Sequence, residues 1–389
     1  MKRSIAFALV LMLLSVVGVR CYGAERKVEA VGFAERVVYH SPQTPGYTAW
    51  VGLWQLPNGR LRYDCLQLTG TREKPVATVP VFESADGGDT WTRVVNTSTE
   101  AVLSPGGYLA VSRDSGRGMA VLPNGTLVRP VWPPEDEKTS GCLERSTDGG
   151  KTWGEKIFFL PPAEYRTWPT LIRRLDDGRL VLFAGCWKRG DHQNGNGALP
   201  NMTKAMFVSS DEGKTWGQPI VVMPTKQGVC EESDFCELPG GDLFFVHRTE
   251  HFPDHQTAVS PLAARMGSSP PQSYWYSDRM QSIVRRQGAG FVPGPCQPAA
   301  LVHSGFPAVL RTRDGIILHL ATTGVHWTPD LGKTWAQLNI PGTPYYPKAL
   351  ERPDGTIVVL GHVGSDDPYG TVDQSIKQQT FRLRASGAP

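Results

Sequence analysis

Four stretches of nearly the same eight letters recur along the chain: SADGGDTW (84–91), STDGGKTW (146–153), SSDEGKTW (209–216) and TPDLGKTW (328–335). Their starts lie 62, 63 and 119 residues apart, and the last interval is close to two periods. Similarity at a fixed period predicts an array of like structural units. A degenerate copy is therefore expected between the third and fourth boxes, and YWYSDRM (274–280) is the segment predicted to be that copy.

Each box has the composition of a tight turn between two strands. An aspartate or serine side chain can bond its own backbone, and the glycine after it can take a positive φ. Threonine and tryptophan then favour a new strand, and the tryptophan brings a large apolar surface to bury. We therefore predict a structural rather than catalytic role for the four box aspartates, Asp86, Asp148, Asp211 and Asp330.

A shorter signal occurs six times, as LPNGRL (56–61), LPNGTL (122–127), LDDGRL (175–180), LPGGDL (238–243), TRDGII (312–317) and RPDGTI (352–357). Asn-Gly or Asp-Gly between apolar runs is a strong hairpin signal. In each full unit the hairpin comes first and the box follows, which makes four strands, A to D. Six such units predict an all-β fold, a six-bladed β-propeller of four-stranded antiparallel blades.

The sixth unit has no box after Gly355, so its outermost strand must come from elsewhere. The segment 35–40 (ERVVYH), ahead of the first hairpin, is expected to close the ring by pairing with 378–384 (QQTFRLR).

The first 23 residues have the features of a signal peptide. Lys2 and Arg3 precede an apolar run over 5–19, and small residues follow near Gly23. The run is too short for a comfortable membrane span, so we expect a secreted or periplasmic protein without membrane insertion. The mature chain would be a single propeller domain over 24–389.

Cleavage would also change the charge of the chain. The formal net charge is +3, and the segment 1–23 carries three basic residues and no acid, so the mature chain would have a net charge of 0. That balance argues against a nucleic-acid partner.

Six cysteines would remain after cleavage, and export would permit disulfides. A bond between Cys230 and Cys236 is one possibility. No cysteine spacing resembles a zinc site, and no cofactor is expected. We expect a monomer.

If the A–B hairpins and the boxes share one end of the propeller, the starts of the A strands and the ends of the B strands ring the opposite end. Ligand sites are expected there. Polar and aromatic groups gathered at such an end suit a carbohydrate. The residues selected as substrate-binding on this basis include Arg113, Arg117, Arg166, His251, Tyr345 and His362.

The segment HRTEHFPDH (247–255) spaces its histidines by four residues, as metal ligands on a helix would be. Here it follows a predicted strand and leads into a proline-rich stretch. We therefore interpret it as a loop insertion beside the pocket rather than a metal site.

Aspartate boxes on a six-bladed propeller resemble the sialidase (neuraminidase) superfamily, and the resemblance covers about residues 30–384. Within it, 232–248 (ESDFCELPGGDLFFVHR) is similar to the segment that carries a catalytic glutamate and one arginine of the carboxylate-binding triad. The resemblance places these roles on Glu232 and Arg248. Likewise, 346–355 (YPKALERPDG) resembles the segment with the tyrosine nucleophile, which implies Tyr346, with Tyr345 one residue away. A tyrosine paired with a glutamate avoids the repulsion between a carboxylate nucleophile and a sialic acid carboxylate.

Other parts of the sialidase pattern are missing. Ala49-Trp50-Val51 stands where sialidases carry Arg-Ile-Pro, and His362 stands where the acidic partner of that arginine is expected. The third arginine is absent from 318–327, and Glu73 is the nearest carboxyl for the acid/base aspartate. Imidazole or alanine replaces a bidentate guanidinium poorly when a carboxylate must be bound.

Three functions follow from this mixture. The first is a secreted, sialidase-like exo-glycoside hydrolase that uses a tyrosine–glutamate couple on a sugar other than ordinary sialic acid. The second is a propeller that binds a glycan without cleaving it, and the third is a lyase acting on uronate polysaccharides.

Overall fold

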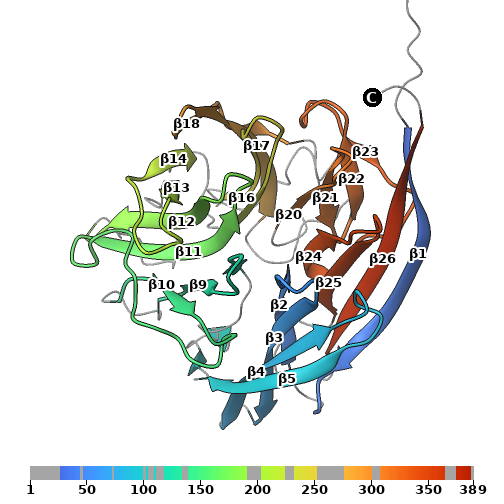
Figure 1. The fold of residues 1–389 in the computed structure, drawn as a ribbon, viewed down its shortest axis with the longest axis horizontal. Coiled ribbons are helices and arrows are strands. Elements are labelled where there is room, and N and C mark those ends of the chain that lie inside the picture. The colour runs from blue at the N-terminus through green and yellow to red at the C-terminus, as the bar shows by residue number, and fades with distance from the viewer. Residues whose placement is uncertain are drawn as a thin grey trace, which may run out of the picture.

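The sheets of this chain are arranged as blades around a common axis (Figure 1). The computed structural model describes residues 27–43, 47–71, 74–99, 102–103, 109–110, 118–133, 139–190, 203–223, 232–251, 276–299, 307–363 and 374–386. Throughout these residues the regular elements are β-strands. The predicted all-β, six-bladed propeller is confirmed.

Each blade is antiparallel, and in blades 1 to 5 the successive strands follow chain order from the axis outward. Blade 1 holds β2 (Tyr47–Gln55), β3 (Leu61–Gly70), β4 (Pro75–Ser84) and β5 (Thr92–Thr99). Blade 2 holds β8 (Ala120–Val121), β9 (Leu127–Val131) and β10 (Cys142–Ser146), with a bridge between Leu143 and Ile157 at its outer edge. Blade 3 holds β11 (Tyr165–Arg174), β12 (Leu180–Lys188), β13 (Thr203–Ser209) and β14 (Ile220–Met223). A small pair, β6 (Val102–Leu103) and β7 (Leu109–Ala110), lies between blades 1 and 2 in the sequence.

The second half of the ring follows the same plan. Blade 4 holds β15 (Ser233–Glu237), β16 (Leu243–His251), β17 (Tyr276–Gln287) and β18 (Gly290–Pro293), and β19 (Gln297–Pro298) also pairs with β17. Blade 5 holds β20 (Ala308–Arg311), β21 (Ile317–Ala321), β22 (Gly324–Thr328) and β23 (Ala336–Gln337). Blade 6 holds β24 (Tyr345–Glu351), β25 (Ile357–Val363), β26 (Ser375–Ser386) and β1 (Lys27–His40).

Blade 6 joins the two ends of the described chain. Strand β1 pairs antiparallel with β26, with Glu35 opposite Gln379 and Arg36 opposite Gln378 (Figure 1). The predicted closure of the ring is therefore confirmed. The pairing extends further than the sequence indicated, since it begins at Lys27 opposite Ser386.

The prediction of a degenerate box at 274–280 is wrong. Residues 276–280 lie inside β17, whose register with β16 runs from Tyr276 to Val284. The outer turn of blade 4 lies instead between Gln287 and Gly290. The segment between β16 and β17 is longer than its counterparts in the other blades, so the outer turn comes later in the sequence. A prediction from the fixed period therefore placed the turn too early.

The first strands of all six blades line a cavity of about 260 Å³ on the axis. Every blade contributes to the wall of this cavity, in order through Leu53, Ala120, Arg173, Asp234, Val309 and Lys348. The A strands thus surround a central channel, as expected for a propeller.

The boxes are turns held by their own side chains. In the third box the Asp211 carboxylate accepts hydrogen bonds from the backbone N–H of Thr215 at 2.9 Å and from its hydroxyl at 2.6 Å. Ser209 donates to Asp211 at 2.8 Å and accepts from the backbone of Gly213, whose φ is +81°. The other three aspartates make the same bonds to the threonine four residues on.

A box mutation should have a small, pH-dependent effect on stability. Burial tends to raise the pKa of Asp211, but the Thr215 and Ser209 hydrogen bonds outweigh it and lower the pKa to about 2. Asp211→Ala should lower the free energy of unfolding by about 1 kcal/mol at neutral pH, a modest value because solvent screens a half-exposed carboxylate.

The sign follows from the lowered pKa. The stabilisation is fully present above the ordinary aspartate pKa of about 4 and is lost as the pH falls toward 2. Urea unfolding of both proteins across this range should show the difference shrinking with acid. Asp314→Ala, an exposed aspartate in a hairpin turn, is the control and should show little difference. An Asp211 effect that persists unchanged at low pH would contradict this account.

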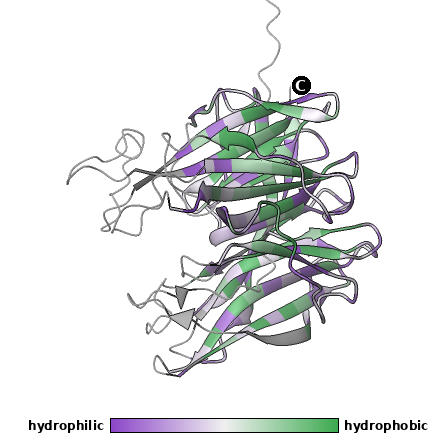
Figure 2. Ribbon diagram, turned by 90° about the vertical axis from the view of Figure 1, so that its left-hand side faces the viewer, coloured by the Kyte–Doolittle hydropathy of each residue, from purple (hydrophilic) through white to green (hydrophobic). Residues whose placement is uncertain are grey.

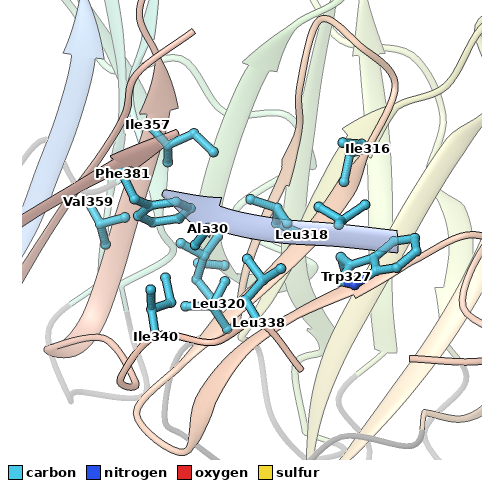
Figure 3. Close-up of a cluster of buried hydrophobic side chains, with 13 residues drawn as sticks. Ala30, Ile316, Leu318, Leu320, Trp327, Leu338, Ile340, Ile357, Val359 and Phe381 are labelled. Carbon is cyan, nitrogen blue, oxygen red and sulfur yellow. The ribbon is translucent and has the colours of Figure 1, made fainter. Parts of the chain in front are cut away.

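Apolar side chains fill the interfaces between blades. Figure 3 shows the interface of blades 5 and 6, where Leu318 and Leu320 of β21 lie beside Val359 of β25 and Phe381 of β26. Ala30 of β1 joins the same cluster, so the ring-closing strand contributes to the core. Hydrophobic residues run along the sheets and hydrophilic ones gather in the turns (Figure 2).

Two further expectations can be compared with the structure. The described part of the chain has no helix long and apolar enough to span a membrane. Cys236 is a free cysteine whose burial raises the pKa of its thiol to about 12. Cys230, its possible disulfide partner, lies outside the described residues.

Candidate active site

The candidate site lies at the end of the propeller opposite the hairpins and boxes, which we call the mouth. The A strands begin there and the B strands end there. In blade 4, Glu232 directly precedes β15, and Arg248 lies near the end of the adjacent β16. The backbone N–H of Arg248 donates to the carbonyl of Glu232 at 3.0 Å, so the two residues are neighbours in the sheet.

The side chains of Glu232 and Arg248 form an ion pair. Nη1 of Arg248 lies 2.6 Å from Oε2 of Glu232. The glutamate side chain is 7% exposed and the arginine side chain 17% exposed. A pair so withdrawn from water is held in a defined orientation.

Tyr346 of blade 6 completes a three-residue cluster with this pair. Its hydroxyl donates to Oε1 of Glu232 at 2.7 Å and lies 3.4 Å from Nη1 of Arg248. The two carboxylate oxygens of Glu232 thus have different partners, the phenol on one and the guanidinium on the other. The predicted convergence of Glu232, Arg248 and Tyr346 is present in the structure.

A backbone irregularity places the tyrosine. Tyr346 has a φ of +52°, and the register of β24 with β25 shifts between Tyr345 and Lys348. Positive φ costs free energy for a residue with a Cβ, and such strain gathers at functional sites. A bulge re-aims a side chain next to a site.

Trp50 repeats this geometry in blade 1. Its φ is +53°, and the register of β2 with β3 shifts between Ala49 and Gly52. Trp50, Glu232 and Tyr346 each stand nine residues before a turn glycine (Gly59, Gly241 and Gly355). The same position thus carries a tryptophan in blade 1, a glutamate in blade 4 and a tyrosine in blade 6. The Trp50 ring is partly buried and packs against an apolar cluster within blade 1.

The rings of His362 and Tyr345 pack against the ring of Tyr346. The His362 ring stacks on the Tyr346 ring at 5.8 Å and 25°, and Tyr345 meets both rings edge-on at 4.7 and 5.2 Å. His362 is 1% exposed. His362 is thus buried against the tyrosine, and its predicted role in substrate binding stays a prediction.

Arg166 is also buried, at 5% exposure. Its guanidinium carbon lies 5.3 Å from the centroid of the Trp187 ring, its partner across the β11–β12 pair. The contact is a cation–π interaction within blade 3. Its predicted role in substrate binding stays a prediction.

The remaining predicted site residues lie beyond what the structure describes. Glu73, Arg113 and Arg117 fall outside the described residues, as does the side chain of His251. Their roles stay predictions.

In the histidine-rich segment 247–255, the structure describes the side chain of His247. Both ring nitrogens of the fully buried His247 lie at hydrogen-bonding distance from serine hydroxyls, 2.8 Å from Ser233 and 3.0 Å from Ser282. Burial and the nearby charge of Lys204 hold the pKa of His247 well below its ordinary value. His247 is thus a satisfied core histidine. Within the described ranges, no group of three or more metal-ligating side chains gathers.

Sequence reasoning missed one residue next to the cluster. Lys204 of β13 is 1% exposed, and its ammonium donates to the backbone carbonyl of Arg248 at 2.5 Å. The available signal was weak: Lys204 is a charged residue directly before the apolar run AMFV of the same strand.

The geometry supports one chemical operation directly. A phenol that donates to a carboxylate at 2.7 Å can lose its proton to that carboxylate and act as a nucleophile. Arg248 fixes the other carboxylate oxygen and keeps the first oxygen directed at the phenol.

Solved structures with this fold cover almost the whole chain. A protein of unknown function from Dyadobacter fermentans matches with a TM-score of 0.59 at 16% identity, covering 92% of this chain and 99% of that one. The α-L-arabinofuranosidase Arb93A from Fusarium graminearum gives 0.60 at 15%, covering 90% and 97%. The intramolecular trans-sialidase from Ruminococcus gnavus gives 0.54 at 12%, covering 89% and 96%. At these identities the likeness concerns the fold alone.

Sequence comparison gives the family. A search of the curated proteins finds no match. Residues 142–361 match the BNR repeat-like domain. This match spans more than half of the chain, and the chain therefore belongs to the BNR repeat-like domain family.

Proposed function

We propose that this protein is an exo-acting glycoside hydrolase that removes a sugar other than ordinary sialic acid from glycan termini. The observation that carries the proposal is the 2.7 Å hydrogen bond from the Tyr346 phenol to the Glu232 carboxylate. Their contact spans blades 4 and 6 at the mouth, where a terminal sugar can enter.

The proposed reaction has two displacements. Glu232 takes the phenolic proton while the Tyr346 oxygen bonds to the anomeric carbon and the glycosidic C–O bond breaks. The leaving oxygen takes a proton from a general acid, for which Glu73 is the sequence candidate. Water then attacks the anomeric carbon and gives its proton to the conjugate base of that acid. The released phenolate recovers its proton from Glu232.

The surroundings of the couple argue against a sialoside. Ala49, followed by Trp50, stands where the first triad arginine is expected, and the buried His362 stands where its acidic partner is expected. Arg248 is engaged by Glu232. Binding a sugar carboxylate favours several converging guanidinium groups, whereas an indole favours the apolar face of a sugar ring. Similar folds include proteins described as arabinofuranosidases and as trans-sialidases, so the architecture accommodates both kinds of sugar.

A screen of natural glycans with mass-spectrometric product detection tests the proposal. The panel should contain sialyl, arabinosyl, uronyl and deoxysugar termini, and Glu232→Gln should be run beside the unmodified protein. We expect one free monosaccharide, different from sialic acid, that is absent with the variant.

The other outcomes separate the alternatives. Binding without release of any sugar would indicate a glycan-binding propeller. A product with a new ultraviolet-absorbing double bond would indicate a uronate lyase. Sialic acid released at the highest rate in the panel would refute the proposed substrate class while leaving the hydrolase intact.

We also propose that the protein is exported after cleavage near Gly23 and acts as a monomer. The signal-like composition of residues 1–23 supports the first point. Mass determination of the mature N-terminus tests cleavage, and light scattering of the mature protein tests the oligomeric state.

A further inference from the structure

Lys204 stands out because a buried ammonium is costly. Its residue exposure is 1%, and it lies on β13, the third strand of blade 3. Moving an ammonium out of water costs several kcal/mol unless polar partners compensate. Such a residue is seldom placed in a sheet for packing alone.

Lys204 reaches from blade 3 to the next blade. It lies in regular register with β12, opposite Gly185. Its ammonium donates to the carbonyl of Arg248 in blade 4 at 2.5 Å, which makes a contact between the two blades.

The acceptor lies at the mouth end of the β15–β16 pair. The N–H of Arg248 donates to Glu232, and the N–H and C=O of one residue in an antiparallel strand face the same neighbour. The carbonyl of Arg248 therefore faces the β15 side, beside Glu232. Lys204 adds a donor to this carbonyl from blade 3.

We propose that Lys204 is a positioning residue, which fixes the backbone of Arg248 so that its guanidinium keeps the Glu232 carboxylate aimed at Tyr346. The links form one chain: the Lys204 ammonium to the Arg248 carbonyl, Nη1 of Arg248 to Oε2 of Glu232 at 2.6 Å, and Oε1 of Glu232 to the Tyr346 hydroxyl at 2.7 Å. The inference rests on the proposed function for its effect on catalysis, but its geometric part is independent of any activity.

Lys204→Met is the decisive variant. It keeps most of the length of the unbranched side chain and removes both the charge and the donor, and replacing a buried charge with an apolar group often preserves folding. Lys204→Arg restores a charged donor, and Lys214→Met removes an exposed lysine from a box as the matched control. Melting temperatures of all three proteins show whether they fold.

Two readouts separate positioning from structural support. The crystal structure of Lys204→Met should show the Arg248–Glu232 contact opened from 2.6 Å to beyond hydrogen-bond range. On the glycan found in the screen, kcat should fall by about 10- to 100-fold with KM nearly unchanged, because small misplacements of reacting groups are costly. Lys204→Arg should recover most of the loss, and Lys214→Met should match the unmodified protein.

The possible failures are distinguishable. If the ion pair keeps its geometry in Lys204→Met, or if kcat is unchanged while the melting temperature falls, Lys204 is a structural residue and the inference is wrong. If no glycan is cleaved by the unmodified protein, the proposed function fails, and the crystal structure alone still decides the role of Lys204. Should Lys204→Met not fold, a Lys204→Arg protein with full stability but an opened ion pair and unrecovered kcat would overturn the inference.

Discussion

Tyr346→Phe is expected to lower kcat for glycan cleavage by a factor on the order of 10³, the range lost when a positioned nucleophile or proton acceptor is removed. Glu232→Gln should have a similar effect, because an amide cannot accept the phenolic proton. Both predictions follow from the 2.7 Å contact between the two side chains. Steady-state kinetics on the sugar found in the screen measures the loss, with KM expected to change much less than kcat.

Tyr345→Phe is the matched control for the nucleophile. Tyr345 is adjacent in sequence, packs edge-on against Tyr346 and also loses only a hydroxyl. It should retain nearly full activity. Because phenylalanine keeps the ring that stacks on His362, the melting temperature of Tyr346→Phe should stay close to that of the unmodified protein. An inactive Tyr345→Phe beside an active Tyr346→Phe would transfer the nucleophilic role to the other tyrosine.

Phe381→Ala is expected to cause a large loss of stability. Phe381 lies on β26 with 1% exposure, inside the cluster that joins blades 5 and 6 and contains Ala30 of β1 (Figure 3). Truncating a buried phenylalanine costs about 3–5 kcal/mol through lost burial and the cavity left behind. Urea unfolding monitored by tryptophan fluorescence should show this decrease in the free energy of unfolding.

Phe158→Ala provides the same change at the surface. Its side chain is 42% exposed, so the variant should lie within about 0.5 kcal/mol of the unmodified protein. Equal effects at the two positions would mean that the interface of blades 5 and 6 carries no special share of the stability.

The fold was largely predictable because its signals are local. A glycine with φ near +80° in each hairpin turn and a box aspartate bonded to a threonine four residues on are set by neighbouring residues. Ring closure by the segment around Glu35 was predictable because the sixth unit lacked a box. The degenerate box predicted at 274–280 was wrong because that prediction used only the spacing of the other boxes. The insertion between β16 and β17 changed this spacing in blade 4.

The site was predictable only in part. The resemblance placed Glu232, Arg248 and Tyr346 together, but their side-chain bonds depend on distances between blades that no sequence window contains. The burial of His362 and Arg166 was not predictable either, because exposure is a tertiary property. Lys204 was missed for the same reason, since its partner is a backbone carbonyl 44 residues away.

The pairing of β1 with β26 also has a consequence for how the chain folds. Glu29 and Arg384, which form an ion pair across these strands, are 355 residues apart. During synthesis β1 must wait for a partner until nearly the whole described chain has been made, and contacts of such sequence separation slow folding. Meanwhile its backbone groups form an open edge to which other chains can add. We therefore expect refolding yield to fall with protein concentration, and a short peptide of residues 27–40 in excess to compete with β1 for β26.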